Sequence, residues 1–230
     1  MRIVKLDLAS EGVLSELGKI KSNERGKLID LELVDVSQEF DVRETRNFSE
    51  PHKVQCRSEG LSDFGERNIV LGNEKMFLES LGKFGRYCSG ARKIPSLIIF
   101  SRKFDIGTFE KIIDFGVSKE NALLVGAENL SGEDISFLAE NRIRKVSLNL
   151  FLEDIADACD VVMEFASGKE LFLMFDFSVI EDFELGGISA LQASYILSRM
   201  GLMKNLSIAY FSGIRENSGK ICAKLMSEVM

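Results

Sequence analysis

Short apolar runs alternate with amphipathic stretches along most of this 230-residue chain. The runs have the length of buried strands, and the stretches between them repeat their apolar residues at helical spacing. This alternation is typical of βαβ units, in which helices cover both faces of a largely parallel sheet. It predicts a three-layer α/β/α sandwich with a mostly parallel sheet of about eight strands. The expected strands are Ile3–Leu8, Leu28–Val36, Ile69–Leu71, Leu97–Phe100, Ala122–Val125, Val146–Leu148, Leu171–Phe175 and Leu206–Phe211.

Helix boundaries are marked by capping residues. The clearest helix is predicted from Ser189 to Met200, because Ser189 and Gln192 form a capping-box pattern and Gly201 follows as a left-handed stop. In SGEDISFLAENR, Ser131 is expected to cap a second helix. The segment FLEDIADACDVVMEFASG is read as a further helix that closes at Gly168.

Two segments do not follow this pattern. Residues 37–67 are rich in charge, include Pro51 and His52, and show little periodicity, so a loop, a short helix and partial disorder all remain open. GKFGRYCSG (82–90) is glycine-rich, but its spacing does not fit a phosphate-binding loop, and it is read as a turn-rich connection. Residues 1–230 are expected to form one domain, which is large enough to bury a substantial core.

Composition excludes several classes of function. The net charge is −7 and no block of Lys and Arg is present, which argues against nucleic acid as a partner. No apolar run approaches the ~18 residues that span a bilayer, so a protein without membrane contact and in the cytoplasm is expected. The four cysteines contain no CxxC pair and are predicted to be free, buried thiols. The single histidine, His52, cannot by itself build a metal site that needs two imidazoles.

Polar residues follow four of the expected strands. The segments are GNEKM (72–76), SRKFD (101–105), DFSVIED (176–182) and FSGIRENSGK (211–220). The carboxyl ends of parallel strands open on one edge of a sheet, which is where open α/β sheets bind their ligands. These segments are therefore expected to lie close together.

At these segments the sequence resembles the ureohydrolase family, the arginase and agmatinase group. NIVLGNEKMFLESL resembles the family's IVLGGEHSLT, SLIIFSRKFD resembles VIHFDAHTD, and LFLMFDFSVIEDFELGGIS resembles a DIDxxDP motif followed by GGLS. ALLVGAENLSGEDISFLAENRIRKVSL resembles the family's IGIR strand and the helix after it. The resemblance runs in order from about Ile69 to the carboxyl terminus and implies an arginase-like fold, whereas residues 1–68 match poorly.

The resemblance implies a centre of two manganese ions, but most of its ligands are replaced in this chain. The motif histidine and the three ligands of DAHxD fall on Lys75, Ser101, Lys103 and Asp105, and the two ligands of DxD fall on Asp176 and Ser178. Only two of these six former metal-site positions keep a carboxylate. The aspartate-proline pair of the motif is Glu181-Asp182, and residues 206–213 lack the acid that contacts substrate in the family.

We therefore expect a protein without catalytic residues, metal or other cofactor, whose role is structural, regulatory or ligand-binding. Its partner is expected to be an unidentified small molecule or protein, and the family's assemblies imply a homo-oligomer. The expected electrostatics follow from the replacements: Lys75 and Lys103 take the place of the cations and pair with Asp105 and Asp176, because unpaired neighbouring carboxylates would destabilise the fold.

Two other functions stay open. A divergent metal-dependent hydrolase of guanidino or linear amide C–N bonds would hold one hard cation such as manganese through carboxylates. Its candidate ligands are Glu74, Asp105, Asp176, Glu181 and Asp182. A nucleotide or small-anion binder would instead use Lys75, Lys103 and a helix amino terminus near Gly186-Gly187. The plainest interpretation is that Asp176 only caps a turn or helix, that Asp105 and Lys103 are ordinary surface charges, and that GGIS only begins a helix.

Overall fold

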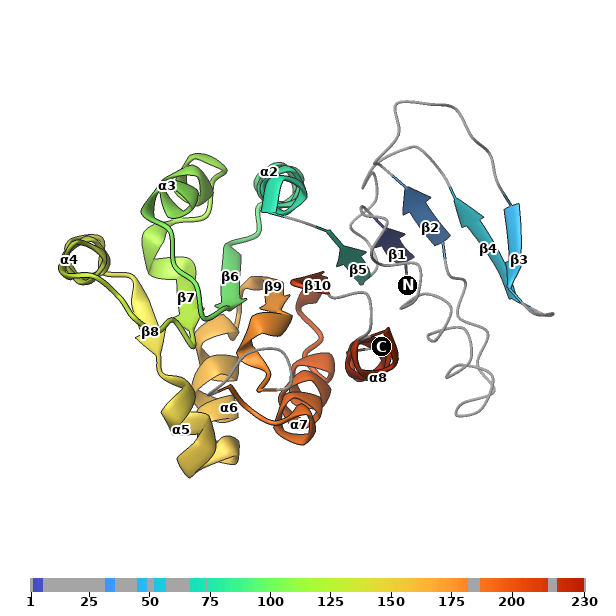
Figure 1. The fold of residues 1–230 in the computed structure, drawn as a ribbon. Helices are drawn as coiled ribbons and strands as arrows, with labels where there is room; N and C mark the ends of the chain where they lie inside the picture. The colour runs from blue at the N-terminus through green and yellow to red at the C-terminus, as the bar shows by residue number, and fades with distance from the viewer. Residues whose placement is uncertain are drawn as a thin grey trace.

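The structure is a computed structural model that describes residues 2–5, 32–35, 45–48, 52–56, 67–72, 74–181, 187–214 and 219–229. A ten-stranded sheet runs through the molecule in the order β3-β4-β2-β1-β5-β10-β9-β6-β7-β8 (Figure 1). The strands are β1 (Arg2–Lys5), β2 (Glu32–Asp35), β3 (Thr45–Phe48), β4 (His52–Cys56), β5 (Asn68–Leu71), β6 (Pro95–Phe100), β7 (Ala122–Val125), β8 (Arg144–Val146), β9 (Glu170–Asp176) and β10 (Leu206–Ser212). The expected mostly parallel sheet is confirmed.

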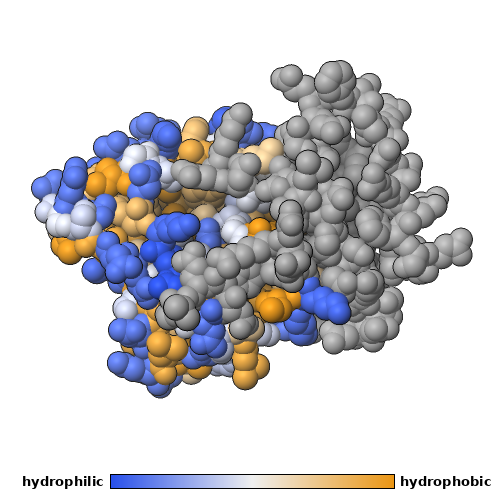
Figure 2. All heavy atoms as spheres, viewed as in Figure 1, coloured by the Kyte–Doolittle hydropathy of each residue, from blue (hydrophilic) through white to orange (hydrophobic). Residues whose placement is uncertain are grey.

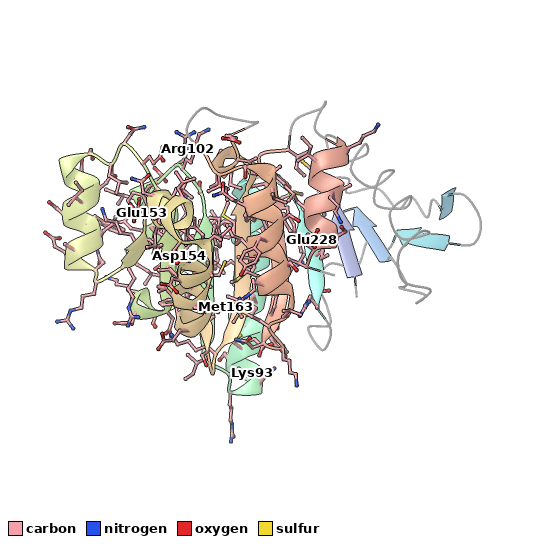
Figure 3. The ribbon with its side chains drawn as sticks, turned by 90° about the horizontal axis from the view of Figure 1, so that it is seen from below. Lys93, Arg102, Glu153, Asp154, Met163 and Glu228 are labelled. Atoms are coloured by element: carbon pink, nitrogen blue, oxygen red, sulfur yellow. The ribbon has the colours of Figure 1, made fainter. Side chains whose placement is uncertain are left out.

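Helices cover both faces of the sheet, as the sandwich prediction requires. One face carries α2 (Glu74–Ala91), α3 (Ile106–Asp114) and α4 (Gly132–Glu140), and the other carries α5 (Leu148–Glu153), α6 (Ile155–Ala166), α7 (Ala190–Gly201) and α8 (Gly219–Ser227) (Figure 1). Seen from below, α6, α7 and α8 lie side by side in front of the strands (Figure 3). Two short 3₁₀ helices, η2 (Lys119–Asn121) and η3 (Phe177–Val179), connect elements.

The core is split into two layers by the sheet. Every second residue of β6, β7, β9 and β10 packs against α5 to α8 on one face of the sheet. The residues between them point to the other face and pack against α2, α3 and α4. The second layer is rich in aromatic rings, among them Phe77, Phe84, Phe172 and Tyr210, which meet edge-to-face or stacked. On the outer surface, hydrophilic and apolar residues are interspersed over the described part of the face in Figure 2.

The sheet has two more strands than the sequence pattern predicts. Both come from the segment 37–67, where β3 and β4 form an antiparallel pair with Phe48 opposite His52. TRNF shows no apolar alternation, and in HKVQC the alternation is limited to Val54 and Cys56, which is too short to stand out from the charged segment. These two strands show that neither a loop nor a helix covers the whole of residues 37–67.

The glycine-rich segment 82–90 is also not a turn, because it lies inside α2. Its glycines have a packing role: a Cβ at Gly82 would lie 2.9 Å from the Phe115 ring, and one at Gly85 would lie 2.0 Å from the Phe115 carbonyl oxygen. The absence of side chains lets α2 approach the end of α3 directly. Glycine thus marks a close helix contact here and not a break in the helix.

The predicted helix caps are found with two corrections. Ser131 and Ser189 both form complete capping boxes, with Asp134 and Gln192. The segment read as one helix is two, α5 and α6, because Asp154 ends the first and caps the second (Figure 3). Gly201 is the last helical residue and not a left-handed stop. A Cβ there would lie 2.5 Å from the carbonyl oxygen of Glu228, so close packing explains this glycine.

Two further predictions concern thiols and membranes. Cys88 and Cys159 are free and buried, as expected, Cys222 is buried as well, and the side chain of Cys56 lies outside the described residues. Among the described residues, no helix is both long and apolar enough to cross a bilayer.

Candidate functional site: a cavity at the strand ends

The carboxyl ends of three adjacent strands meet at one edge of the sheet. Asp176 is the last residue of β9 and pairs in register with Ser212, the last residue of β10. Ser101 directly follows β6, which lies on the other side of β9. The sheet therefore brings together polar residues that are more than a hundred positions apart, as the sequence pattern predicts.

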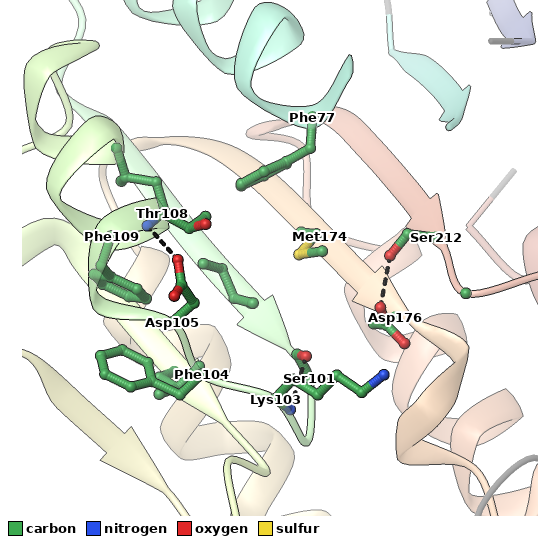
Figure 4. A pocket seen from close by; sticks show the side chains of 14 residues that line it. Phe77, Ser101, Lys103, Phe104, Asp105, Thr108, Phe109, Met174, Asp176 and Ser212 are labelled. Carbon is green, nitrogen blue, oxygen red and sulfur yellow. Dashed lines mark hydrogen bonds between the residues drawn. The ribbon is translucent and has the colours of Figure 1, made fainter. Parts of the chain in front are cut away.

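A cavity of about 320 Å³ opens at this edge (Figure 4). Its polar residues are Ser101, Lys103, Asp105, Thr108, Asp176 and Ser212. The rest of its lining is almost entirely apolar and includes Phe77 of α2, Phe109 of α3 and Met174 of β9. These apolar residues belong to the core between the sheet and α2 and α3, or pack against it, so the cavity extends from the strand ends into that core layer.

Asp176 is held by hydrogen bonds from its own neighbourhood. One carboxylate oxygen accepts the Ser178 backbone N–H at 2.7 Å, and the other accepts the Ser212 hydroxyl at 3.0 Å. Gly213 lies close against it with φ +73°, and a Cβ there would lie 2.6 Å from Oδ1. The strand end thus fixes a half-buried carboxylate in the cavity wall.

Asp105 has a different orientation. It caps α3, and its carboxylate accepts the Thr108 backbone N–H at 2.7 Å. Figure 4 shows this side chain turned toward Thr108, away from Asp176. Hydrogen bonds from the Thr108 side chain and backbone lower the pKa of Asp105. The charged cap therefore stabilises the fold at neutral pH, and that contribution is lost as the pH falls through the lowered pKa.

Replacing Asp105 by alanine should lower the free energy of unfolding by about 0.5–2 kcal/mol, because an orphan helix N–H loses its acceptor. Asp105→Asn keeps an acceptor and should recover most of this loss. The matched control is Asp114→Ala, at the exposed carboxyl end of α3, where removing a negative charge should be neutral or slightly stabilising. Urea unfolding measures all three, and an Asp105→Ala variant as stable as wild type would contradict the capping role.

Ser101 and Lys103 shape the loop that follows β6. The Ser101 backbone N–H donates to the Val125 carbonyl at 3.0 Å, and the Ser101 hydroxyl accepts the Lys103 backbone N–H at 3.1 Å. Between them, Arg102 forms an ion pair with Glu128 at 2.6 Å, which ties this loop to the loop after β7. Lys103 is exposed and its amine end points toward the Asp176 side of the cavity (Figure 4).

The expected ion pairs are not formed by Lys103. No ion pair within 4.0 Å joins Lys103 to Asp105 or Asp176, both of which lie in the described part of the chain. Backbone N–H and hydroxyl donors, and not the Lys103 ammonium, bind the two carboxylates. Lys75 belongs to α2, but its side chain lies outside the described residues.

The remaining predicted site residues lie elsewhere. Ser178 is buried in η3, and its hydroxyl has no hydrogen-bond partner among the described residues. Glu181 is exposed after the bridge between Ile180 and Ile188 and does not line the cavity. Glu74 begins α2 with an undescribed side chain, and Asp182 and Gly186 lie outside the described residues.

The arrangement of strands and helices matches solved structures closely enough to assign the fold. The chain matches no known protein-family model and no curated protein. Arginase from Bacillus caldovelox has a TM-score of 0.71 at 11% identity, covering 99% of this chain and 97% of that one. Entamoeba histolytica arginase has a TM-score of 0.67 at 13% identity, with the same coverage. The chain has the ureohydrolase fold. Formimidoylglutamase from Bacillus subtilis, at 9% identity and a TM-score of 0.63, covers 99% of this chain and 84% of its own.

The described residues at the strand ends do not form the two-manganese centre that the sequence resemblance implies. Among them, no group of three or more His, Cys, Asp or Glu side chains is placed to hold a metal ion. The two carboxylates that line the cavity face different protein donors, and the cavity wall also carries the cationic Lys103. Divalent ions need several oxygen or nitrogen ligands directed at one point, and the described side chains do not supply such a set.

The GGIS segment keeps a structural role in the fold. Ile188 donates to the Val179 carbonyl at 2.8 Å and accepts the Glu181 N–H at 2.9 Å, so the chain after η3 pairs with the chain before α7. A Cβ at Gly187 would lie 2.3 Å from the Val179 carbonyl oxygen. Glycine is required there by the approach of two backbones.

Sequence reasoning missed three kinds of lining residue. Ser212 and Gly213 lie in the segment 211–220, which the strand-end rule selected, but neither of them was named as a site residue. Thr108 lies one helical turn after the capping Asp105, at a position where capping partners are expected. Phe77 and Met174 gave no signal, because they look like any other core residues.

Proposed function

We propose that this protein is a non-catalytic member of the ureohydrolase fold that lacks the binuclear metal centre and binds a small molecule at the strand-end cavity. Its role would then be ligand-binding or regulatory, and a purely structural role is the alternative. One observation supports the proposal most directly. Protein donors bind the carboxylates of Asp105 and Asp176, and the cavity that both residues line is otherwise largely apolar.

Electrostatics support this proposal. Lys103 lies at a position where the resemblance places a metal ligand, and an ammonium group near a divalent cation repels it. The adjoining wall of Phe77, Phe109 and Met174 offers no ligand for a hard cation, but it suits the apolar part of an organic molecule.

The second candidate is a divergent metal-dependent hydrolase. It is favoured by the fact that Asp105 and Asp176 line the same cavity, so one hard cation such as manganese could recruit both after side-chain rotation. Some neighbours of the same fold are named as arginase and formimidoylglutamase, which supports guanidino or linear C–N bonds as the substrates of such an enzyme. A homo-oligomeric assembly also stays a prediction.

Metal content and activity separate the two candidates. Protein purified without chelator should contain less than stoichiometric manganese, and added Mn²⁺ should leave the melting temperature unchanged. A tight site would instead stabilise the fold by about 2.7 kcal/mol at a free metal concentration of about 100 Kd. Urea release from arginine or agmatine should stay at the background of a no-protein control. Stoichiometric Mn²⁺ with thermal stabilisation, or release of urea, would favour the hydrolase.

A further inference from the structure

We propose that the ligand of the strand-end cavity is an α-amino acid with an aromatic or branched aliphatic side chain. Its side chain occupies the apolar part of the cavity, and its ammonium and carboxylate groups bind Asp176 and Lys103 at the polar edge. This inference rests on the ligand-binding function proposed above and adds to it a chemical class of ligand.

The size of the cavity sets the first limit. Its volume of about 320 Å³ is at the lower end of the ~300–1,000 Å³ found for small-molecule sites. This space accommodates one amino-acid side chain and excludes a nucleotide or dinucleotide bound entirely within it. The ligand is therefore a small molecule.

The wall of the cavity sets the second limit. Phe77, Phe109 and Met174 approach the cavity from α2, α3 and β9, respectively (Figure 4). Phe77 and Phe109 are at most 3% exposed, so the inner surface belongs to the packed core. Transfer of an apolar group from water to such a surface is favourable, and rings and a thioether contact aromatic and aliphatic side chains well. A strongly polar side chain would lose its hydration here without gaining partners.

The charges at the polar edge set the third limit. Asp176 forms no ion pair with any described residue, yet it is half-buried and keeps acceptor capacity beyond its two protein hydrogen bonds. The amine end of Lys103 points toward the Asp176 side but forms no ion pair with it. An ammonium beside Asp176 and a carboxylate beside Lys103 would satisfy both charges at once.

A ligand with only one charge fits less well. An anionic ligand would pair with Lys103 but would be repelled by Asp176 and Asp105, which both line the cavity. A cationic ligand would pair with Asp176 but would leave the nearby Lys103 ammonium without a counter-charge. Asp105 already accepts hydrogen bonds from Thr108 and is turned away, so the zwitterion is assigned to Lys103 and Asp176.

Calorimetric titration of the full chain with L-phenylalanine tests the proposal. Saturable binding with a Kd below about 1 mM is expected. Phenethylamine lacks the carboxylate and 3-phenylpropionate lacks the ammonium, and each should bind about ten- to a hundredfold more weakly, as expected for the loss of a hydrogen bond between charged groups. L-serine keeps the zwitterion without an apolar side chain and should show no binding.

Variants locate the site. Lys103→Met should weaken L-phenylalanine binding about tenfold or more without changing stability, because Lys103 is exposed. Met174→Trp should fill the cavity and abolish binding, whereas Met163→Trp, on α6 at the other face of the sheet (Figure 3), should leave affinity unchanged. Melting temperatures show that each variant is folded.

Three results would overturn this assignment: no binding of L-phenylalanine, equal affinity for L-phenylalanine and phenethylamine, or unchanged affinity after both Lys103→Met and Met174→Trp. Each of these can occur while manganese binding and urea release remain absent, and the non-catalytic function proposed above would then stand. Manganese binding with urea release would instead overturn that function, whatever the amino-acid titrations show.

Discussion

Replacing Arg67 by alanine should lower the free energy of unfolding by about 3–5 kcal/mol. The guanidinium group donates to four backbone carbonyls, those of Gly201, Met203 and Val229 at 2.8 Å each and that of Leu206 at 3.3 Å. These carbonyls lie at the end of α7, at the start of β10 and just after α8, where helices leave carbonyl groups without intrahelical partners. Removing the guanidinium leaves four partly buried acceptors without their donor.

Two variants control this experiment. Arg67→Lys keeps the charge but not the planar array of donors, so it should recover only part of the stability. Arg86→Ala removes an exposed arginine from α2 and should change stability by less than about 0.5 kcal/mol. Denaturant unfolding gives all three values. If Arg67→Ala behaved like Arg86→Ala, the four hydrogen bonds would not hold the ends of α7 and α8 in place.

Gly85→Ala should destabilise the fold by about 3 kcal/mol, although alanine is the better helix former. The new methyl group would lie 2.0 Å from the Phe115 carbonyl oxygen, which is a backbone atom and cannot rotate away. Relieving this steric clash requires α2 to move away from the end of α3. Both helices contribute residues to the lining of the strand-end cavity. For a chain of this size the melting temperature should fall by roughly 6–12 °C.

Gly90→Ala is the matched control on the same helix. Gly90 lies in the last turn of α2, and a Cβ there meets nothing within 4 Å. Alanine should therefore stabilise the fold by about 0.5–1 kcal/mol through its helix propensity. The two substitutions are chemically identical and differ only in what the methyl group meets. Equal effects on melting temperature would show that the contact between α2 and Phe115 does not constrain the helix.

Local patterns in the sequence were sufficient for several parts of this structure. Apolar runs predicted seven of the ten strands, and an eighth strand, expected over Val146–Leu148, lies at Arg144–Val146, since Leu148 begins α5. Ser131 and Ser189 were both expected as caps, Ser189 from its capping-box pattern with Gln192. The strand-end rule brought together the segments that contain Ser101, Lys103, Asp105 and Asp176, and these four residues line one cavity. These features depend on residues within a few positions of one another or on a general property of parallel sheets.

Other features could not be predicted because the deciding contact is distant in sequence. Arg67 reads as one more charge in a polar segment, yet its partners lie 134 to 162 positions away. Gly85 reads as a turn residue until Phe115 is placed beside it. The pairing of β3 with β4 does not follow from their composition, since TRNF carries no apolar alternation and HKVQC only a short one at Val54 and Cys56.

The amino-acid sequence alone determined the layered α/β architecture, the order of its elements and the edge of the sheet where polar residues gather. Only the tertiary structure decided what those polar residues do: Asp105 caps α3, Asp176 is held by Ser178 and Ser212, and an apolar cavity opens between them. The reason is physical. Periodicity and strand ends are encoded locally, whereas the direction of a carboxylate depends on which donors the folded chain brings within about 3 Å of it.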